Sequence, residues 1–167
     1  HGGQTARSGD GGRTWHGFHD FGIQDDHSDY AAFGGIAFGN GVFVAATGWG
    51  APAHVLRSED GVSWDDRPDD AFVDDVGGGR PNSSSGVEFT GDEFVLFAGP
   101  ALWRSPDGRV WTEDTPPSLE FAGHFREVEY LPEADLLLIA VETEDAQPWR
   151  IHGSADGGYT WAWGDGV

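Results

Sequence analysis

The chain has 167 residues, enough for one domain with its own core, and its 29 acidic residues outnumber nine basic ones for a formal net charge of −20. This balance argues strongly against nucleic acid as a partner, because phosphate binding requires a basic face, and it disfavours anionic membrane surfaces. Cysteine is absent, which excludes disulfides and thiolate metal sites. The 27 glycines and eight tryptophans are typical of many short strands joined by tight turns.

Four segments share one pattern, in which a serine is followed by Asp-Gly and then by a tryptophan. They cover residues 7–15, 57–64, 104–111 and 153–161. The serines of successive segments are 50, 47 and 49 residues apart, which matches the length of a four-stranded propeller blade. The second and third segments are one residue shorter between aspartate and tryptophan, so we expect tighter turns there.

These segments resemble the Asp box, or BNR repeat, of sialidase-like and photosynthesis-assembly-factor-like β-propellers. The resemblance implies an all-β fold of four-stranded antiparallel blades, about three and a half of them, within a single half-ring domain over 1–167. With the strands of a blade labelled A to D from the axis outward, a C–D half blade is expected at about 5–20. Complete blades are expected at about 30–70, 84–115 and 124–164.

The chemistry of the box is explained by the turn it forms. Its aspartate and serine accept backbone N–H groups, its glycine permits a positive φ, and its tryptophan covers the hairpin. We therefore interpret the box residues as structural and not catalytic. They are Ser8, Asp10, Trp15, Ser58, Asp60, Trp64, Ser105, Asp107, Trp111, Ser154, Asp156 and Trp161.

Three and a half blades leave a ring open and its end faces bare. We therefore expect either a homodimer, in which a second copy completes the ring, or completion by the remainder of the ring on sequence not present here. Closure would bring the connections between blades around a central channel, where propellers of this type usually carry their function.

Acidic residues gather in those connections, which predicts a negative face able to attract a carbohydrate or a cationic ligand. His27 lies between Asp26 and Asp29, and an imidazole beside carboxylates can ligate a divalent metal. No spacing in the chain is diagnostic of a metal site. A cation such as calcium is therefore one alternative, and a solvated acidic surface is the other.

Other polar and aromatic residues are predicted near the same face. Sialidases clamp a carboxylate with three arginines and pair a tyrosine with a glutamate, but their Arg-Ile-Pro signature is absent from this chain. Exposed tryptophans stack on sugars or cationic groups. The candidate ligand-binding residues are Arg80, His124, Arg126, Trp49, Trp149, His54 and Tyr30.

Two functions remain open from the sequence. One is a non-catalytic propeller that binds a ligand or a protein across its acidic face, and the other is a hydrolase of glycans or similar small substrates. No nucleophile motif favours the second. The first residue, His1, is not methionine, so a preceding segment has been either removed or left out. Removal of a signal peptide is one of these alternatives, and from it we expect an extracellular or periplasmic protein. The longest apolar run, 136–141, is too short to span a bilayer.

Overall fold

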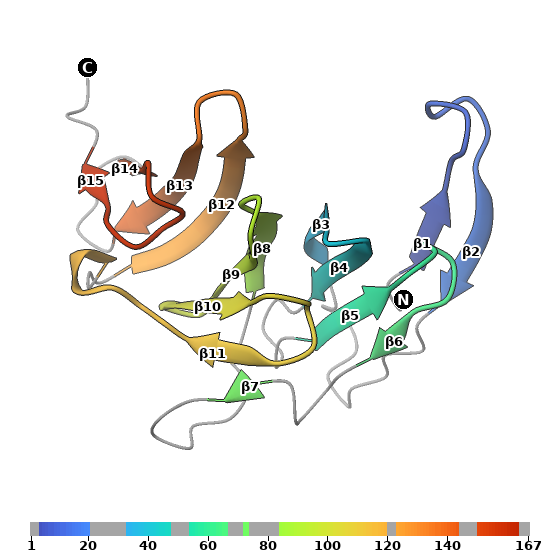
Figure 1. The fold of residues 1–167 in the computed structure, drawn as a ribbon, viewed down its shortest axis with the longest axis horizontal. Coiled ribbons are helices and arrows are strands. Elements are labelled where there is room, and N and C mark those ends of the chain that lie inside the picture. The colour runs from blue at the N-terminus through green and yellow to red at the C-terminus, as the bar shows by residue number, and fades with distance from the viewer. Residues whose placement is uncertain are drawn as a thin grey trace.

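A computed structural model describes residues 4–20, 33–47, 54–66, 72–73, 84–119, 123–143 and 150–163. These residues form an all-β structure, as predicted, with one 3-10 helix, η1 (Pro117–Leu119). Figure 1 shows four sheets side by side along an open arc, with a two-stranded hairpin at one end. In the part of the chain that the structure describes, no helix has the length and apolar character that crossing a membrane requires.

The chain begins with the N-terminal hairpin and continues as three antiparallel meanders, in which each strand pairs with the next. The hairpin is β1 (Gln4–Arg7) and β2 (His16–Asp20). Meander 1 is β3 (Phe33–Gly39), β4 (Val42–Thr47), β5 (His54–Ser58) and β6 (Asp65–Asp66). Meander 2 is β8 (Ser84–Phe89), β9 (Phe94–Ala98), β10 (Ala101–Ser105) and β11 (Trp111–Glu113). Meander 3 is β12 (Gly123–Leu131), β13 (Leu136–Thr143), β14 (Arg150–Ser154) and β15 (Ala162–Trp163).

One strand was not predicted. β7 (Phe72–Val73) lies between meanders 1 and 2 in sequence, but it pairs in parallel with β11 at the outer edge of meander 2. Meander 2 therefore belongs to a five-stranded sheet in which β7 is the outermost strand. A two-residue strand that pairs far from its own hairpins leaves no periodic signal in the sequence.

The meanders share detailed geometry as well as strand order. The first strand of each has a register shift near its start, between Phe33 and Gly35, Ser84 and Gly86, and Phe125 and Glu127. Such bulges insert one extra residue and bend the strand. The same irregularity at the same place in three sheets indicates that β3, β8 and β12 are equivalent strands.

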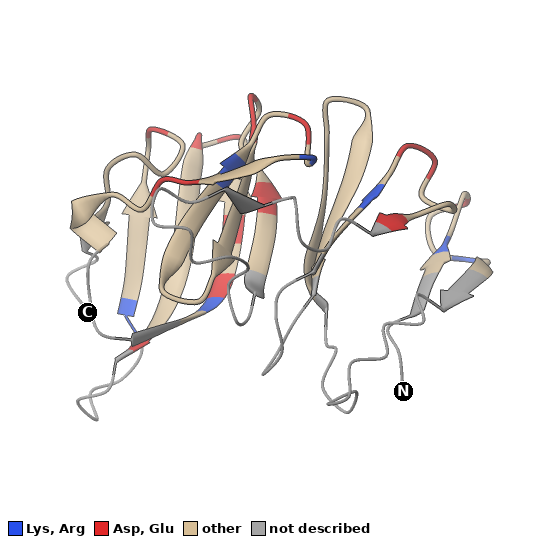
Figure 2. Cartoon of the chain, turned by 90° about the horizontal axis from the view of Figure 1, so that it is seen from below, with Lys and Arg blue, Asp and Glu red and all other residues tan. Residues whose placement is uncertain are grey.

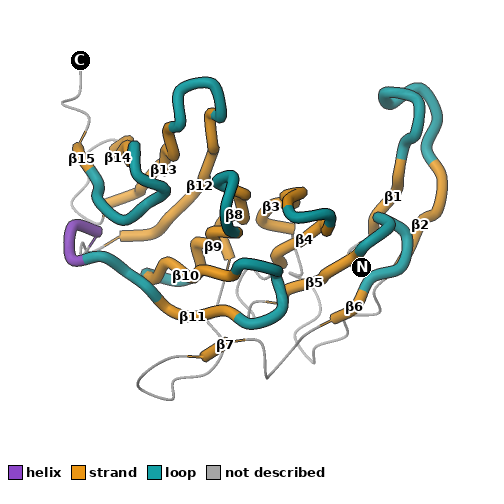
Figure 3. The backbone as a smooth tube through the Cα atoms, viewed as in Figure 1, coloured by secondary structure: helices purple, strands orange, loops and turns teal. Residues whose placement is uncertain are grey.

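The turns joining the first two strands lie on the same edge as the Asp-box turns (Figure 3). The turn between β3 and β4 has positive φ at Asn40 (49°) and Gly41 (79°), the chemistry of a tight type I′ hairpin. The Asn40 side chain donates hydrogen bonds to the carbonyls of Asp92 (3.3 Å) and Pro106 (3.0 Å) in meander 2. These bonds connect a hairpin turn of one meander to both kinds of turn in the next.

Two apolar cores lie between the meanders. The first core packs Val44 of meander 1 against Phe94 and Trp111 of meander 2. The second core packs Phe97 of meander 2 against Ile139 of meander 3. All five side chains are at most 1% exposed, so the meanders are held face to face by apolar burial.

Candidate functional site

The Asp-box turns hold their backbone through the predicted acceptors. In the first box, Asp10 Oδ1 accepts the backbone N–H groups of Arg13 and Thr14, both at 2.9 Å, and Ser8 Oγ accepts that of Gly12 at 2.7 Å. The Thr14 hydroxyl, the largest influence, and the backbone bonds lower the pKa of Asp10 to about 2. These carboxylates are therefore occupied by the turn itself.

The second and third boxes are tighter, as their shorter spacing predicts. Asp60 Oδ1 accepts from Val62 and Ser63 at 2.7 Å, and Asp107 Oδ1 accepts from Arg109 at 2.9 Å. The bonds thus reach residues two and three positions ahead, whereas in the first box they reach three and four. Each short turn therefore contains one residue fewer, and its aspartate still accepts backbone N–H groups.

Asp107→Ala is expected to lower the free energy of unfolding by roughly 1–3 kcal/mol, because the turn loses its backbone acceptor. Urea denaturation followed by circular dichroism measures this change. Glu133→Ala, an exposed substitution in the turn between β12 and β13, is the control and should stay within about 0.5 kcal/mol of the parent. An Asp107→Ala protein as stable as the parent would contradict the structural role of the box.

An arginine before each of the first three boxes contacts the box turn of the next sheet. Arg7 Nη1 donates to the Asp60 carbonyl at 2.9 Å, and Arg57 Nε donates to the Asp107 carbonyl at 3.0 Å. Arg104 Nη1 donates to the Gly157 carbonyl at 2.9 Å. Box turns that are about 50 residues apart are therefore connected in series, from the N-terminal hairpin to meander 3.

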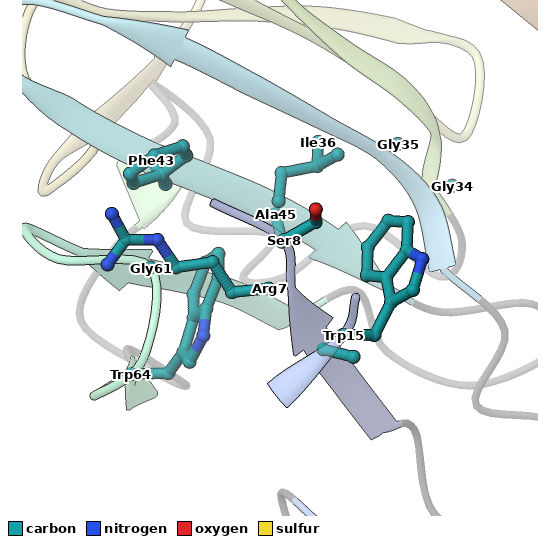
Figure 4. Close-up of a pocket in the computed structure, with 11 residues that line it drawn as sticks. Arg7, Ser8, Trp15, Gly34, Gly35, Ile36, Phe43, Ala45, Gly61 and Trp64 are labelled. Atoms are coloured by element: carbon teal, nitrogen blue, oxygen red, sulfur yellow. The ribbon is translucent and has the colours of Figure 1, made fainter. Parts of the chain in front are cut away.

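An open apolar groove of about 540 Å³ lies between the N-terminal hairpin and meander 1 (Figure 4). Trp15 stands on the hairpin side, Trp64 belongs to the second box turn, and Ile36 and Phe43 come from β3 and β4. Arg7 extends from the end of β1 and is the only charged residue among those that line the groove. A site of this composition suits an apolar surface of a partner better than a small charged substrate.

The groove exposes large apolar side chains that are buried elsewhere in the repeat. Trp15 and Ile36 are both 57% exposed. Their equivalents in meander 2 are Trp111, which is fully buried, and Val87, which is 1% exposed. The residues at these positions are similar in type, so the difference in exposure arises from what packs against each side chain.

A pair of acidic side chains lies on the first strands of meanders 2 and 3. Burial of Glu88, followed by the negative charge of Glu129, raises the pKa of Glu88 to about 7. Figure 2 shows acidic positions inside strands as well as along one edge of the sheets. A carboxyl group with this pKa can carry a proton near neutral pH, as a general acid must.

The predicted ligand residues are only partly within the described chain. Arg80, Trp49, Trp149, Tyr30 and the predicted metal ligands Asp26, His27 and Asp29 lie outside the described residues. His54 begins β5 in meander 1, whereas His124 and Arg126 lie on β12 in meander 3. Meander 2 separates these two locations. Across the residues described here, no group of three metal-ligating side chains is present.

Arg126 sits at the bulge of β12 and forms an ion pair with Glu142. Its Nε donates to Glu142 Oε2 at 2.7 Å, and its Nη2 contacts the same oxygen. The opposing strand β13 provides this glutamate, which also faces His124 in the strand register. The arginine is therefore already paired with a carboxylate of its own sheet, and a ligand carboxylate would have to compete for it.

Sequence reasoning missed the groove, the Glu88 and Glu129 pair, and the arginine contacts between sheets. The repeated arginine at the start of three boxes was visible in the sequence, but its partner lies about 50 residues further along. No family model matches the chain, and no curated protein matches it. Its likeness to Asp-box proteins therefore rests on the four motifs and their spacing.

Proposed function

We propose that the chain is a section of an Asp-box β-propeller and serves as a non-catalytic binding module that recognises a protein partner. The apolar groove carries this proposal, because Trp15, Ile36 and Phe43 offer a partner a contiguous apolar surface with aromatic side chains. Buried aromatic anchors dominate the energetics of protein interfaces. The repeated four-stranded order and the serial arginine contacts support the propeller part of the proposal.

The proposal includes assembly into a ring with a second copy. The outer face of meander 3 supports it, since Ile151 is 57% exposed whereas its equivalents Val55 and Leu102 are fully buried. A second copy arranged head to tail would cover this face with its own N-terminal hairpin. An exported location and a carbohydrate or cationic ligand on the acidic loops, most of which lie outside the described residues, complete the proposal.

Light scattering at micromolar concentration tests the assembly. We expect a particle of twice the 17.9 kDa chain mass, because burial of the exposed Ile151 side chain favours association. Ile151→Asp should shift the equilibrium to monomer, and Glu133→Ala, in an exposed turn, is the matched control. A parent chain that remains a monomer at these concentrations would contradict the ring of two copies.

One observation favours a second candidate, a hydrolase. Burial, followed by the charge of Glu129, raises the pKa of Glu88 to about 7, a value suited to a general acid. Chromogenic glycosides offered to the assembled protein at pH 5 to 8 test this candidate. Turnover that is lost in Glu88→Gln would support hydrolysis, whereas turnover unchanged by this substitution would exclude Glu88 as the acid.

Glu88 also predicts a pH dependence of stability. Its pKa is about 7 in the folded chain and 4.5 in the unfolded one, so the unfolded chain loses the proton first as pH rises. The contribution of Glu88 to the free energy of unfolding is therefore fully present below pH 4.5 and is lost progressively up to about pH 7. Glu88→Gln should remove this loss. At pH 8 the free energy of unfolding should exceed that of the parent by on the order of 1 kcal/mol, a figure reduced for solvent screening of a half-buried group. At pH 4 the variant and the parent should differ little. Equal gains at both pH values in urea titrations would contradict the shifted pKa.

A further inference from the structure

The first strands of the three meanders pack through one repeated contact between glycine and valine. Val87 of β8 lies against Gly35 of β3, where an added Cβ would be 3.1 Å from the Val87 backbone nitrogen. Val128 of β12 lies against Gly86 of β8, where an added Cβ would collide with the valine side chain. Both valines are buried. The absence of a side chain on each glycine is what permits this close approach.

Ile36 occupies the same position in β3, but none of the described strands packs against it. It is 57% exposed and lies in the groove. Phe38, two residues further along the same face, is 58% exposed. Its equivalents are covered, since Phe89 packs onto the first core and Tyr130 onto the second. The face of meander 1 that borders the groove therefore has the side chains of a sheet interface, and no sheet of the described residues lies opposite it.

The hairpin side of the groove has a matching open edge. β1 leads into an Asp box, as β5, β10 and β14 do, and so is their equivalent. Each of those strands pairs on both edges, whereas β1 pairs only with β2 among the described strands. Ala6, Arg7 and Ser8, at the end of β1, line the groove. In each meander, two strands precede the strand that leads into the box, and the second of them pairs with it. Among the described residues, the hairpin sheet has no strands that correspond to these two.

We propose that the groove binds a two-stranded antiparallel β-hairpin of a partner polypeptide. One strand of the partner would pair with the edge of β1 that no described strand covers, adding main-chain hydrogen bonds. The other would lie over β3, with a glycine opposite Ile36 and small apolar residues over Phe38. This inference rests on the proposed binding function and names the kind of partner that the groove accepts.

The chain's own meander 3 does not fit the groove, so a second copy is not the occupant. Glu127 of β12 stands where β3 and β8 carry Gly35 and Gly86, and its side chain would occupy the space that Ile36 requires. Gly153 replaces the arginine that precedes the other three boxes, so the contact to a following box turn is missing. A head-to-tail ring of two copies would leave the groove accessible.

The probe is a cyclised peptide with the sequence of residues 33–47, which form β3 and β4. In the folded chain these two strands cover the face of meander 2 that is equivalent to the groove face of meander 1. Fluorescence anisotropy of the labelled peptide, titrated with the full chain, measures its binding. Ile36→Asp is expected to weaken binding at least tenfold. Val110→Asp is the matched control, because Val110 is a branched apolar side chain that is 51% exposed in the third box turn, away from the groove, and it should leave binding unchanged.

A second peptide, with valine in place of Gly35, tests the glycine contact and should bind at least tenfold more weakly. Hydrogen exchange provides a further readout: the bound peptide should protect backbone amides of β1 and leave those of β15 unchanged. Absence of peptide binding to the folded chain, or equal binding of the two peptides, would overturn the inference. Equal weakening by Ile36→Asp and Val110→Asp would also overturn it but would leave the proposed binding function untouched. Light scattering tests the assembly independently.

Discussion

Arg104→Ala is expected to lower the free energy of unfolding by roughly 3 kcal/mol, one of the two largest effects in the chain. The guanidinium group is 7% exposed and joins meanders 2 and 3. Its Nε donates to Asp114 at 2.7 Å, and its Nη1 donates to Glu93 at 2.7 Å and to the Gly157 carbonyl at 2.9 Å. It also lies 3.8 Å from the centre of the Tyr159 ring.

The cost of removing Arg104 comes mainly from the groups left behind. The Glu93 side chain is only 22% exposed and would lose its buried cationic partner. The Tyr159 hydroxyl donates to the same carboxylate at 3.1 Å and cannot neutralise it. Arg104→Lys should recover only part of the loss, because an ammonium group cannot reproduce the planar fork of donors.

Urea denaturation of the parent and variant chains measures this loss. Arg109→Ala is the matched control, because Arg109 is 42% exposed and its ion pairs with Glu59 and Asp107 are 3.8 and 4.0 Å long. It should change stability by less than about 0.5 kcal/mol. Equal effects of Arg104→Ala and Arg109→Ala would show that the contact between the sheets contributes no more than a surface ion pair.

The all-β class and the turns could be predicted because their chemistry is local. Asp10 and Gly11 fix a box turn within five residues, and Asn40 with Gly41 specifies the tight turn between β3 and β4. The difference between long and short boxes was also predictable, since it follows from counting residues between Asp60 and Trp64. Closure of the ring stays a prediction.

The candidate site could not be predicted, because it depends on which sheets lie side by side. Ile36 and Val87 each follow a glycine at the equivalent position of their strands, yet one is exposed and the other buried. The elevated pKa of Glu88 requires both its burial and Glu129, which lies 41 positions further along the chain. Arg126 was predicted as a ligand residue from its place near a strand, and its pairing with Glu142 depends on the register of β12 and β13.

Trp111→Ala is expected to lower the free energy of unfolding by about 3–5 kcal/mol, the other of the two largest effects. Trp111 is the tryptophan of the third box, is fully buried, and fills the first core between meanders 1 and 2. Its Nε1 has no hydrogen-bond partner among the described residues, in contrast to Nε1 of Trp161, which donates to the Gly158 carbonyl at 2.9 Å. Trp111→Phe should therefore cost much less than the alanine variant, because it retains most of the apolar volume and removes an unpaired N–H group.

Trp15→Ala is the matched comparison, since Trp15 occupies the same box position but is 57% exposed beside the groove. Its loss should cost less than about 1 kcal/mol, because it leaves no cavity in a core and removes only the hydrogen bond from Nε1 to the Gly12 carbonyl. Thermal and urea unfolding of the three variants measure the contrast. A Trp15→Ala protein destabilised as severely as Trp111→Ala would mean that the groove is closed in solution and that its tryptophan lies in a core. The graded result would instead show that neighbouring sheets, and not the motif, determine the energetic contribution of each box.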